Sequence, residues 1–311
     1  MFKNDWYRYR YDDDEYYQPK RHQGQKFNTA IFTENTKLLS YKDSLIFNAN
    51  EIANCFNNKK FALMLSGGLD SDVMFRASLE AGLDFTTYIF RFENDTNIYD
   101  VSYAIALCES HGAKYKLVDL NVTKFYETEA MKFADIAQTD RPRALPQLKF
   151  LDYIDEEFFI YGQGDINWKR LNEINYDEKG DWVHSCNEHE ISWEKYIRAT
   201  NRKGVPLWFK YTPELQLSTA LTNWSQDLLN DRIYGKLGWT SSKMKIYSSL
   251  GYEFRKRPKW HGVENYIHLW DAVRYNMSAA GLDFNSRCYS VSAHLLKENL
   301  INGVETLCQV A

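Results

Sequence analysis

Long hydrophobic runs, a disulfide-forming cysteine pattern and an excess of basic charge are all missing from this sequence. Its apolar runs are far too short to span a membrane, and Met1–Asp5 does not open a signal-peptide core. The 5 cysteines are scattered and odd in number, which predicts reduced thiols in a cytoplasm. A net charge of −4 gives no general reason to expect a nucleic-acid or membrane partner. What remains is a globular composition, with 44% hydrophobic residues and enough length for one large α/β domain or two small ones.

Strand-like and helix-like segments alternate from about residue 27 to residue 164. Repeated units of strand and helix predict an α/β fold, in which a doubly wound parallel sheet binds its ligand at the carboxyl ends of its strands. The expected strands are Phe61–Leu65, Phe85–Phe92, Lys114–Leu120 and Phe158–Gly162. The expected helices are Ser71–Ala81, Ile98–His111, Lys124–Ala137 and Pro146–Ile154.

The two flanks of this alternating region have different patterns. Residues 1–27 are dense in tyrosine and charge and predict an irregular arm, although alternating Tyr and Arg could also stack on bases. Later, two strand-like segments flank the turn-like sequence DEKGD and predict a hairpin, and from about Ser192 the pattern is mostly helical. The predicted division is an N-terminal arm (1–27), an α/β domain (28–170), and a hairpin with a C-terminal helical subdomain (171–311) that closes over the sheet edge.

The segment FALMLSGGLDSD (61–72) indicates an anion site. A buried apolar strand leads into a loop with adjacent glycines and then a helix, an arrangement that points backbone N–H groups and the positive helix end at an anion. Ser66 and Ser71 add hydroxyl donors, and the loop lacks the lysine of a Walker phosphate loop. Asp70 beside a phosphate requires a cation between the two, which indicates Mg²⁺.

The SGGxDS pattern directly after the first expected strand resembles the phosphate loop of the PP-loop ATP pyrophosphatase family. The resemblance implies that ATP and Mg²⁺ are bound here and that ATP is split into AMP and pyrophosphate. It also implies that residues 28–170 form the ATP-binding domain, and that Asp70 is both catalytic and a metal ligand. The cofactor-binding residues implied at this loop are Leu65, Ser66, Gly67, Gly68, Asp70 and Ser71.

Further stretches resemble the asparagine synthetase-like branch of the family, in its C-terminal synthetase domain. Residues 86–121 are similar to that branch's second strand, helix and third strand, which implies that the backbone of Phe90 receives adenine. FIYGQGDINW (159–168) is similar to the loop SGEGSDE that follows the fourth strand. This similarity implies cofactor contacts for Tyr161 and Gly162.

Residues 243–266 carry the last of these similarities. An Arg-x-Lys followed by Gly-Val supplies the lysine that meets the α-phosphate in that branch. Arg257-Pro258-Lys259 and Gly262-Val263 stand at the matching places, which implies that Lys259 is catalytic. The resemblance covers roughly residues 40–270 and is absent before about residue 30.

The sequence departs from the family pattern in two ways. Gln163 occupies the position of a glutamate that would assist proton removal, and an amide cannot act as a base, so another group does this or the acceptor chemistry differs. Asp165 is expected to be the second magnesium-linked carboxylate, with the register uncertain by one residue. The glutaminase domain, which needs an N-terminal cysteine, is not matched by Met1-Phe2, so the nitrogen is expected to arrive as ammonia or an amine.

The sequence therefore predicts an AMP-forming, ATP-dependent ligase or amidotransferase that adenylates a carboxylate or an amide oxygen and transfers it to a nitrogen nucleophile. Its partners would be a small-molecule acceptor and an ammonia or amine donor, with nucleic acid not favoured at this net charge. Two alternatives stay open. One is a PP-loop enzyme that modifies an RNA or nucleotide base, and the other is an ATP-binding interaction protein without catalysis.

Two clusters are set aside in favour of simpler interpretations. His184, Cys186 and His189 lie within six residues but lack a fourth zinc ligand, so a solvent-facing hairpin edge is preferred. Arg141-Pro142-Arg143 could meet an anionic substrate, but a surface position before a helix is preferred.

Overall fold

The computed structural model describes ten stretches of the chain, which include nearly all of the predicted α/β domain. They are residues 6–12, 14–18, 20–31, 36–164, 168–170, 182–221, 239–254, 262–279, 287–292 and 306–310.

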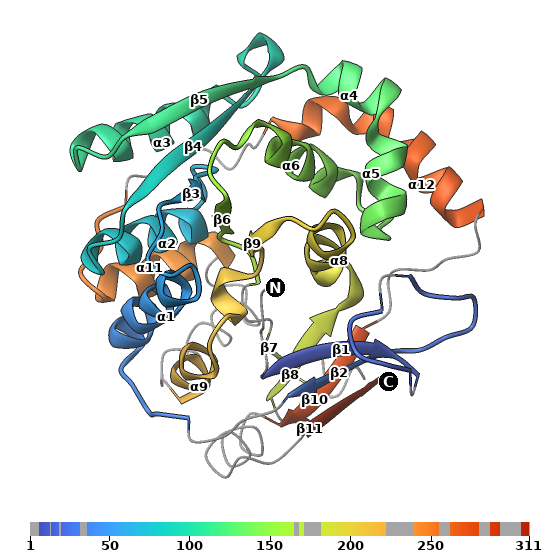
Figure 1. Cartoon of the computed structure of the whole chain (residues 1–311), viewed down its shortest axis with the longest axis horizontal. Helices are drawn as coiled ribbons and strands as arrows, with labels where there is room; N and C mark the ends of the chain where they lie inside the picture. Colours follow the sequence, from blue (N-terminus) through green and yellow to red (C-terminus); the bar gives the residue numbers. More distant parts are fainter. Residues whose placement is uncertain are drawn as a thin grey trace.

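A five-stranded parallel sheet forms the centre of the chain (Figure 1). Its strand order is β5-β4-β3-β6-β9, and every neighbouring pair is parallel. The four predicted strands are confirmed nearly to the residue, because each is a short segment of strand-forming residues bounded by turns. The fifth strand, β9, was not predicted. The bounds are β3 Phe61–Met64, β4 Phe85–Phe92, β5 Tyr115–Leu120, β6 Phe158–Tyr161 and β9 Lys203–Val205.

Helices cover both faces of this sheet, so the predicted doubly wound α/β class is confirmed. Successive residues of β3 point to opposite faces: Phe61 and Leu63 join one hydrophobic core, and Ala62 and Met64 join the other. The first core lies under α1 (Tyr41–Cys55), α2 (Leu69–Glu80), α3 (Ile98–Ser110), α9 (Pro213–Leu221) and α11 (Trp239–Ser249). The second lies under α4 (Val122–Thr128), α5 (Ala130–Ala137), α6 (Leu145–Lys149), α8 (Ser192–Ala199) and α12 (Trp270–Ala279).

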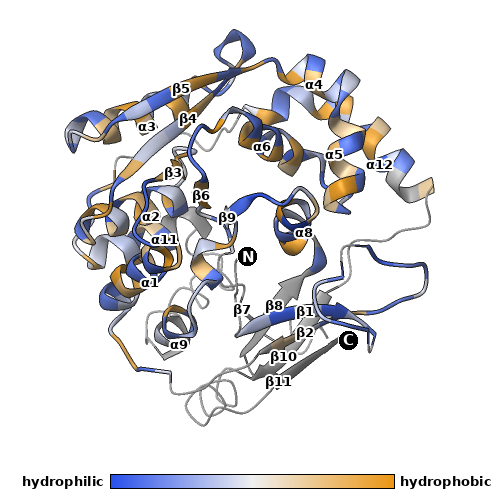
Figure 2. Cartoon of the chain, in the orientation of Figure 1, coloured by the Kyte–Doolittle hydropathy of each residue, from blue (hydrophilic) through white to orange (hydrophobic). Residues whose placement is uncertain are grey.

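These helices are amphipathic, as their positions require. In Figure 2 they carry hydrophilic as well as hydrophobic residues, which suits elements that cover a sheet on one side and meet solvent on the other. The single helix expected over Lys124–Ala137 is divided into α4 and α5 at Glu129. Helices of the predicted C-terminal subdomain also pack on the sheet domain, since α8 and α12 both contact α5. None of the helices in the described stretches is long and apolar enough to cross a membrane.

Short 3₁₀ helices connect several of these elements. They are η1 Glu93–Asp95, η2 Pro142–Ala144, η3 Phe150–Tyr153, η4 Glu188–Ile191, η5 Trp208–Lys210 and η6 Val263–Leu269.

A second, six-stranded sheet joins segments from both ends of the chain (Figure 1). Its order is β1-β2-β11-β10-β8-β7, and its neighbouring strands are antiparallel. The strands are β1 Tyr7–Tyr11, β2 Phe27–Ile31, β7 Trp168–Arg170, β8 Trp182–Asn187, β10 Arg287–Ser292 and β11 Thr306–Val310. The prediction of an irregular N-terminal arm is therefore wrong for β1. The mostly helical C-terminal pattern likewise missed β10 and β11, which pair with each other and with the distant strands β8 and β2.

Strand β1 explains why the arm is ordered. The exposed fractions of Tyr7, Tyr9 and Tyr11 are 1%, 0% and 0%. The arginines that alternate with them, Arg8 and Arg10, are only half-buried. The alternation YRYRY is thus the two-residue period of a strand with one face in the core.

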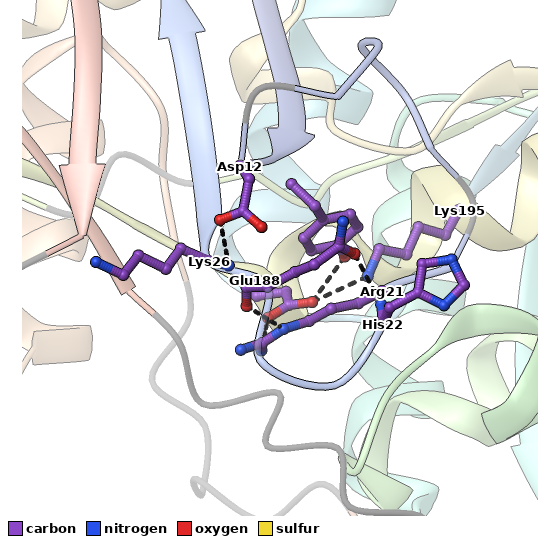
Figure 3. A network of polar contacts seen from close by, with 8 residues as sticks. Asp12, Arg21, His22, Lys26, Glu188 and Lys195 are labelled. Carbon is purple, nitrogen blue, oxygen red and sulfur yellow. Dashed lines mark hydrogen bonds and ion pairs between the residues drawn. The ribbon is translucent and has the colours of Figure 1, made fainter.

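A buried ionic cluster fastens this arm to the rest of the chain. Glu188, which is fully buried, accepts hydrogen bonds from the Tyr11 hydroxyl at 2.7 Å, the Arg21 guanidinium at 2.9 Å and the Lys195 ammonium at 3.3 Å. Figure 3 shows Glu188 lying between Arg21 and Lys195. Burial lowers the pKa of Lys195 to about 8, and burial with the Glu188 charge raises the pKa of Tyr11. A single carboxylate therefore balances two cations and holds β1 against η4 and α8.

Replacing this carboxylate should destabilise the fold strongly. Glu188→Gln leaves Lys195 and Arg21 without their counter-charge, which costs on the order of 3–5 kcal/mol for a broken buried pair. Urea unfolding followed by tryptophan fluorescence measures the difference.

The matched control is Glu157→Gln. Glu157 also pairs with two cations, Lys59 and Lys203, but its side chain is 43% exposed. Solvent screens that pair, so the control should unfold like the wild type. Equal effects of the two substitutions would mean that the buried cluster does not stabilise the arm.

Candidate functional site

The order of the parallel sheet fixes where a ligand can bind. Strand β3 lies between β4, which follows it in the chain, and β6, which comes later, so the direction of winding reverses between β3 and β6. At such a switch point the loops that leave the carboxyl ends of the two strands separate and open a crevice. The SGGLDS loop follows β3 and the YGQG loop follows β6. The two stretches singled out from the sequence thus leave adjacent strands at the same edge.

The loop after β3 depends on the absence of a side chain at Gly67. This residue has φ +79°, and a Cβ atom there would lie 2.3 Å from the carbonyl oxygen of Asp100. The Ser66 hydroxyl accepts from the Gly68 N–H at 3.2 Å and lies 3.1 Å from the Ser71 hydroxyl. The tight turn delivers the chain directly into α2, whose N-cap, Gly68, makes no side-chain capping bond. The first N–H groups of α2 are therefore available to an anion.

A cavity of about 280 Å³ lies against this helix end and is called the loop cavity here. It brings together polar groups from the loops after β3 and β6 and aromatic rings from β4 and η3. Its lining residues are Ser66, Gly68, Asp70, Ser71, Phe90, Phe92, Asn97, Asp100, Arg143, Gln147, Phe150, Tyr161, Gly162, Gln163 and Val263. A polar part beside an apolar part suits a ligand with an anionic tail and a flat body.

The aromatic part of the loop cavity is closely packed and hydrogen-bonded. The rings of Phe90 and Phe150 are stacked with their centroids 3.5 Å apart and an interplanar angle of 13°. Asn97, which is buried, accepts from the Phe92 N–H and donates to the Phe90 carbonyl, each at 2.8 Å. The Phe90 carbonyl, the group implied to meet adenine, thus has one of its two acceptor positions occupied.

Asp70 receives a cation from a distant part of the chain. Lys243 on α11 donates to both of its carboxylate oxygens, at 2.9 and 3.0 Å, and the Tyr247 hydroxyl donates at 3.1 Å. The Lys243 side chain is 8% exposed and the Asp70 side chain 33%. Lys243 and Tyr247 were not predicted, because lysine and tyrosine on an ordinary helix carry no local signal for a contact 173 residues away.

The loop after β6 supplies the opposite wall. A Cβ atom at Gly162 would lie 3.1 Å from the Cα atom of Ser71, so this loop packs on the start of α2. Burial raises the pKa of Tyr161, which keeps its hydroxyl neutral. The side-chain amide nitrogen of Gln163 lies 3.4 Å from Gln147 Oε1. The backbone carbonyl of Gln163 accepts a hydrogen bond from the Phe209 N–H.

Most of the residues predicted from the sequence meet at the loop cavity. Ser66, Gly68, Asp70, Ser71, Phe90, Tyr161, Gly162 and Gln163 all line it. Gly67 shapes the turn without lining the cavity, and the Leu65 side chain is fully buried in the core. Asp165 and Lys259 lie outside the described residues, so their metal-binding and catalytic roles stay predictions.

Two further lining residues had partial sequence signals. Val263, in the Gly-Val pair that marks the third similar stretch, lines the cavity. Its neighbour Gly262 has φ +78°, and a Cβ atom there would lie 2.6 Å from the carbonyl oxygen of Thr96. Arg143, whose tripeptide was interpreted as a surface segment, also lines the cavity.

The histidine and cysteine cluster lies partly on a strand. His184 and Cys186 belong to β8, which pairs antiparallel with β7. The first arm of the observed hairpin is therefore 168–170, and the predicted arm at 172–176 lies outside the described residues. Within the described stretches, no group of three His, Cys, Asp or Glu side chains is arranged to hold a metal.

Comparison with known proteins gives structural but not sequence matches. No protein-family model and no curated protein sequence matches the chain. The chain is similar to the NMN synthetase of Francisella tularensis, with 13% identity, a TM-score of 0.31 and coverage of 78% of this chain and 95% of that one. It is also similar to the NH3-dependent NAD synthetase of Campylobacter jejuni, with 11% identity, a TM-score of 0.34 and the same coverages.

A third similar structure is the glutamine-dependent NAD+ synthetase of Acinetobacter baumannii. Identity is 14%, the TM-score is 0.31, and the match covers 83% of this chain and 51% of that one. The chemistry is inferred from the site residues alone.

Gly67→Ala tests whether the tight loop forms the binding site. The added Cβ would overlap the Asp100 carbonyl, so the loop must shift, and MgATP binding should fall at least ~100-fold or be lost, as when preorganised N–H donors are displaced. Isothermal titration calorimetry measures the affinity, and circular dichroism confirms that the variant folds.

Gly82→Ala is the control, because Gly82 at the other end of α2 also has positive φ but no atom within 4 Å of its added Cβ. It carries only the backbone strain of about 1–2 kcal/mol. It should bind MgATP like the wild type. Wild-type affinity in Gly67→Ala would exclude this loop as the phosphate site.

Proposed function

We propose that this protein is an AMP-forming, ATP-dependent ligase of the asparagine synthetase-like PP-loop type. It adenylates a carboxylate or an amide oxygen of a small-molecule acceptor and releases pyrophosphate. A nitrogen nucleophile, ammonia or an amine, then displaces AMP.

One observation supports this proposal above all others. Four residues of the SGGLDS loop, Phe90 and three residues of the YGQG loop are separated by up to about a hundred positions in the sequence, yet they line a single cavity at the switch point of a parallel sheet. Parallel sheets bind nucleotides at this place. Polar groups beside the free N-terminus of α2 suit phosphates, and the stacked rings of Phe90 and Phe150 suit a purine.

Different residues of the loop cavity would bind the phosphates and the base of ATP. Backbone N–H groups at the start of α2 and the hydroxyls of Ser66 and Ser71 would hold the terminal phosphates of ATP. The rings of Phe90 and Phe150 would hold the base, and Val263 would close over it. Binding of this kind fixes the α-phosphorus in front of the acceptor, which is the main contribution of positioning to catalysis.

We infer that Asp70 is one ligand of a magnesium ion. Mg²⁺ takes one or two carboxylates together with phosphate oxygens, and Asp70 presents its carboxylate to the loop cavity, where a cation already balances it. Asp70, with Asp165 as the predicted second ligand, would hold Mg²⁺, which supplies positive charge for the pyrophosphate group. Lys243 would then add its charge to the same phosphates, and Lys259 keeps its predicted role at the α-phosphate.

The chemistry proceeds in two displacements. An acceptor oxygen bonds to the α-phosphorus while the bond from that phosphorus to the bridging oxygen breaks, and pyrophosphate leaves. The nitrogen nucleophile then bonds to the activated carbon, AMP leaves with the transferred oxygen, and the nitrogen loses one proton. Gln163 cannot accept this proton, so in this chain the proton goes to solvent or to a group other than residue 163.

A second candidate function is ATP binding without catalysis. Two observations favour it: Gln163 is an amide where the resemblance expects a carboxylate, and the Asp70 carboxylate is engaged by Lys243 and Tyr247. In that case the chain would bind ATP and act through interaction with a partner.

The products of ATP cleavage distinguish these functions. ATP labelled at the α-phosphate is incubated with the protein, Mg²⁺ and separate pools of carboxylates, amides and RNA, each with ammonium present. We expect acceptor-dependent AMP and pyrophosphate, and Asp70→Asn should lower turnover at least ~100-fold by removing a charge that the transition state needs. Formation of ADP and phosphate would contradict the ligase assignment, and tight ATP binding without AMP would favour the second candidate.

Lys243→Ala tests whether the lysine on α11 takes part in turnover. Loss of one charge donor near the phosphates should lower kcat at least ~100-fold while ATP still binds. Lys245→Ala removes an exposed lysine two residues away on the same helix and should behave like the wild type. If the two variants are equally active, Lys243 serves only as the counter-charge of Asp70.

A further inference from the structure

A second and larger cavity adjoins the loop cavity. It has a volume of about 680 Å³ and is called the outer cavity here. Arg143, Gln147 and Gln163 line both cavities, so the two spaces meet at these three side chains. A molecule in the outer cavity therefore reaches the loop cavity across a wall that contains one guanidinium and two amides.

Charged side chains of both signs line the outer cavity. Arg141, Arg143 and Arg274 line it, against the carboxylates of Glu190 and Glu264. Glu190 is already bonded to the Lys210 ammonium at 2.7 Å, so its charge is balanced by the protein. An arginine of this cavity that is not already paired would favour an anionic ligand.

Arg143 has the clearest capacity to bind such a ligand. Its side chain is exposed, and among the described residues no hydrogen-bond or ion-pair partner is recorded for it. By contrast, Arg274 lies over the Trp270 ring at 5.5 Å and 3.8 Å from an Asp271 oxygen, and Arg141 lies 3.9 Å from an Asp140 oxygen. A guanidinium presents a planar pair of donors that matches a carboxylate.

The rest of the outer cavity is apolar. Trp193, Trp270 and Ile267 line it, and Ile267 is one of the large hydrophobic side chains left substantially exposed, at 48%. Trp193 packs on Tyr161 with ring centroids 4.4 Å apart, which connects this wall to the loop cavity. An apolar body would cover these side chains while its charged end faces the shared wall.

We propose that the outer cavity is the acceptor site and binds a small organic carboxylate with an apolar body, its carboxylate paired with Arg143. This inference rests on the proposed function and decides between its two acceptor groups in favour of the carboxylate. One carboxylate oxygen forms a bond to the α-phosphorus of ATP as the bond to the bridging oxygen breaks. The products are an acyl adenylate and pyrophosphate, and no proton is transferred in this step.

The test measures binding without ATP, so its outcome is independent of whether ATP is cleaved. The probes are acetate, phenylacetate and indole-3-acetate, each paired with its neutral amide, and affinities are measured by calorimetry and ligand-observed NMR on the full chain. We expect at least one of the two aromatic carboxylates to bind ~10-fold or more tightly than its amide, the discrimination of one lost charge-assisted bond of about 1.5 kcal/mol. Acetate should bind more weakly than either, because it lacks the apolar body.

Arg143→Ala should abolish the preference for the carboxylate over its amide. Arg91→Ala is the matched control, because Arg91 is a partly exposed arginine that pairs with Asp119 on β5. The Arg91→Ala variant should prefer the carboxylate over its amide as strongly as the wild type does. The inference is overturned if no carboxylate binds better than its amide, or if the preference survives in Arg143→Ala. AMP formation from amides alone, with carboxylate binding intact, would instead contradict the adenylation of the bound group.

Discussion

The site depends on two close backbone contacts, each made possible by a glycine. Gly67 lies against the carbonyl of Asp100, and Gly162 lies against the start of α2 at Ser71. These two contacts bring the loops after β3 and β6 and the start of α3 within reach of one ligand. A Cβ atom at Gly67 would overlap the Asp100 carbonyl, and one at Gly162 would force Ser71 to shift by a few tenths of an ångström. The hydroxyls, carboxylate and aromatic rings of the loop cavity are therefore placed by backbone packing before any of them interacts with a ligand.

A charge in such a crevice has to be balanced in the absence of ligand. Asp70 lies at the helix N-terminus, where a carboxylate is favourable, but it is two-thirds buried and needs a partner. Lys243 and Tyr247 supply that partner from α11. A metal ion at Asp70 would compete with Lys243 for this carboxylate.

The sequence predicts the parts of this protein that depend on local information. Phe61–Met64 is a continuous apolar run, Phe85–Phe92 is rich in aromatic and β-branched residues, and Gly67-Gly68 precedes a helical pattern, so these strands and the tight loop before α2 were predicted. The parts that depend on distant partners were missed. Lys203–Val205 is too short to signal a strand alone, and Lys243 becomes meaningful only when it reaches Asp70. The period-two pattern of Tyr7–Tyr11 was present but was obscured by its arginines, which a half-buried face tolerates.

The N-terminal segment is connected to the outer cavity through a chain of contacts. The Trp6 indole donates to the carbonyls of Lys210 and Tyr211, at 3.1 and 2.9 Å, and the Lys210 ammonium lies 5.4 Å from the centre of the Tyr7 ring. That ammonium holds Glu190 at the outer cavity. Because Lys210 pairs with Glu190, the charge of that carboxylate is balanced within the protein. The segment that looked least structured in the sequence therefore helps to set the electrostatics of the cavity where we place the acceptor.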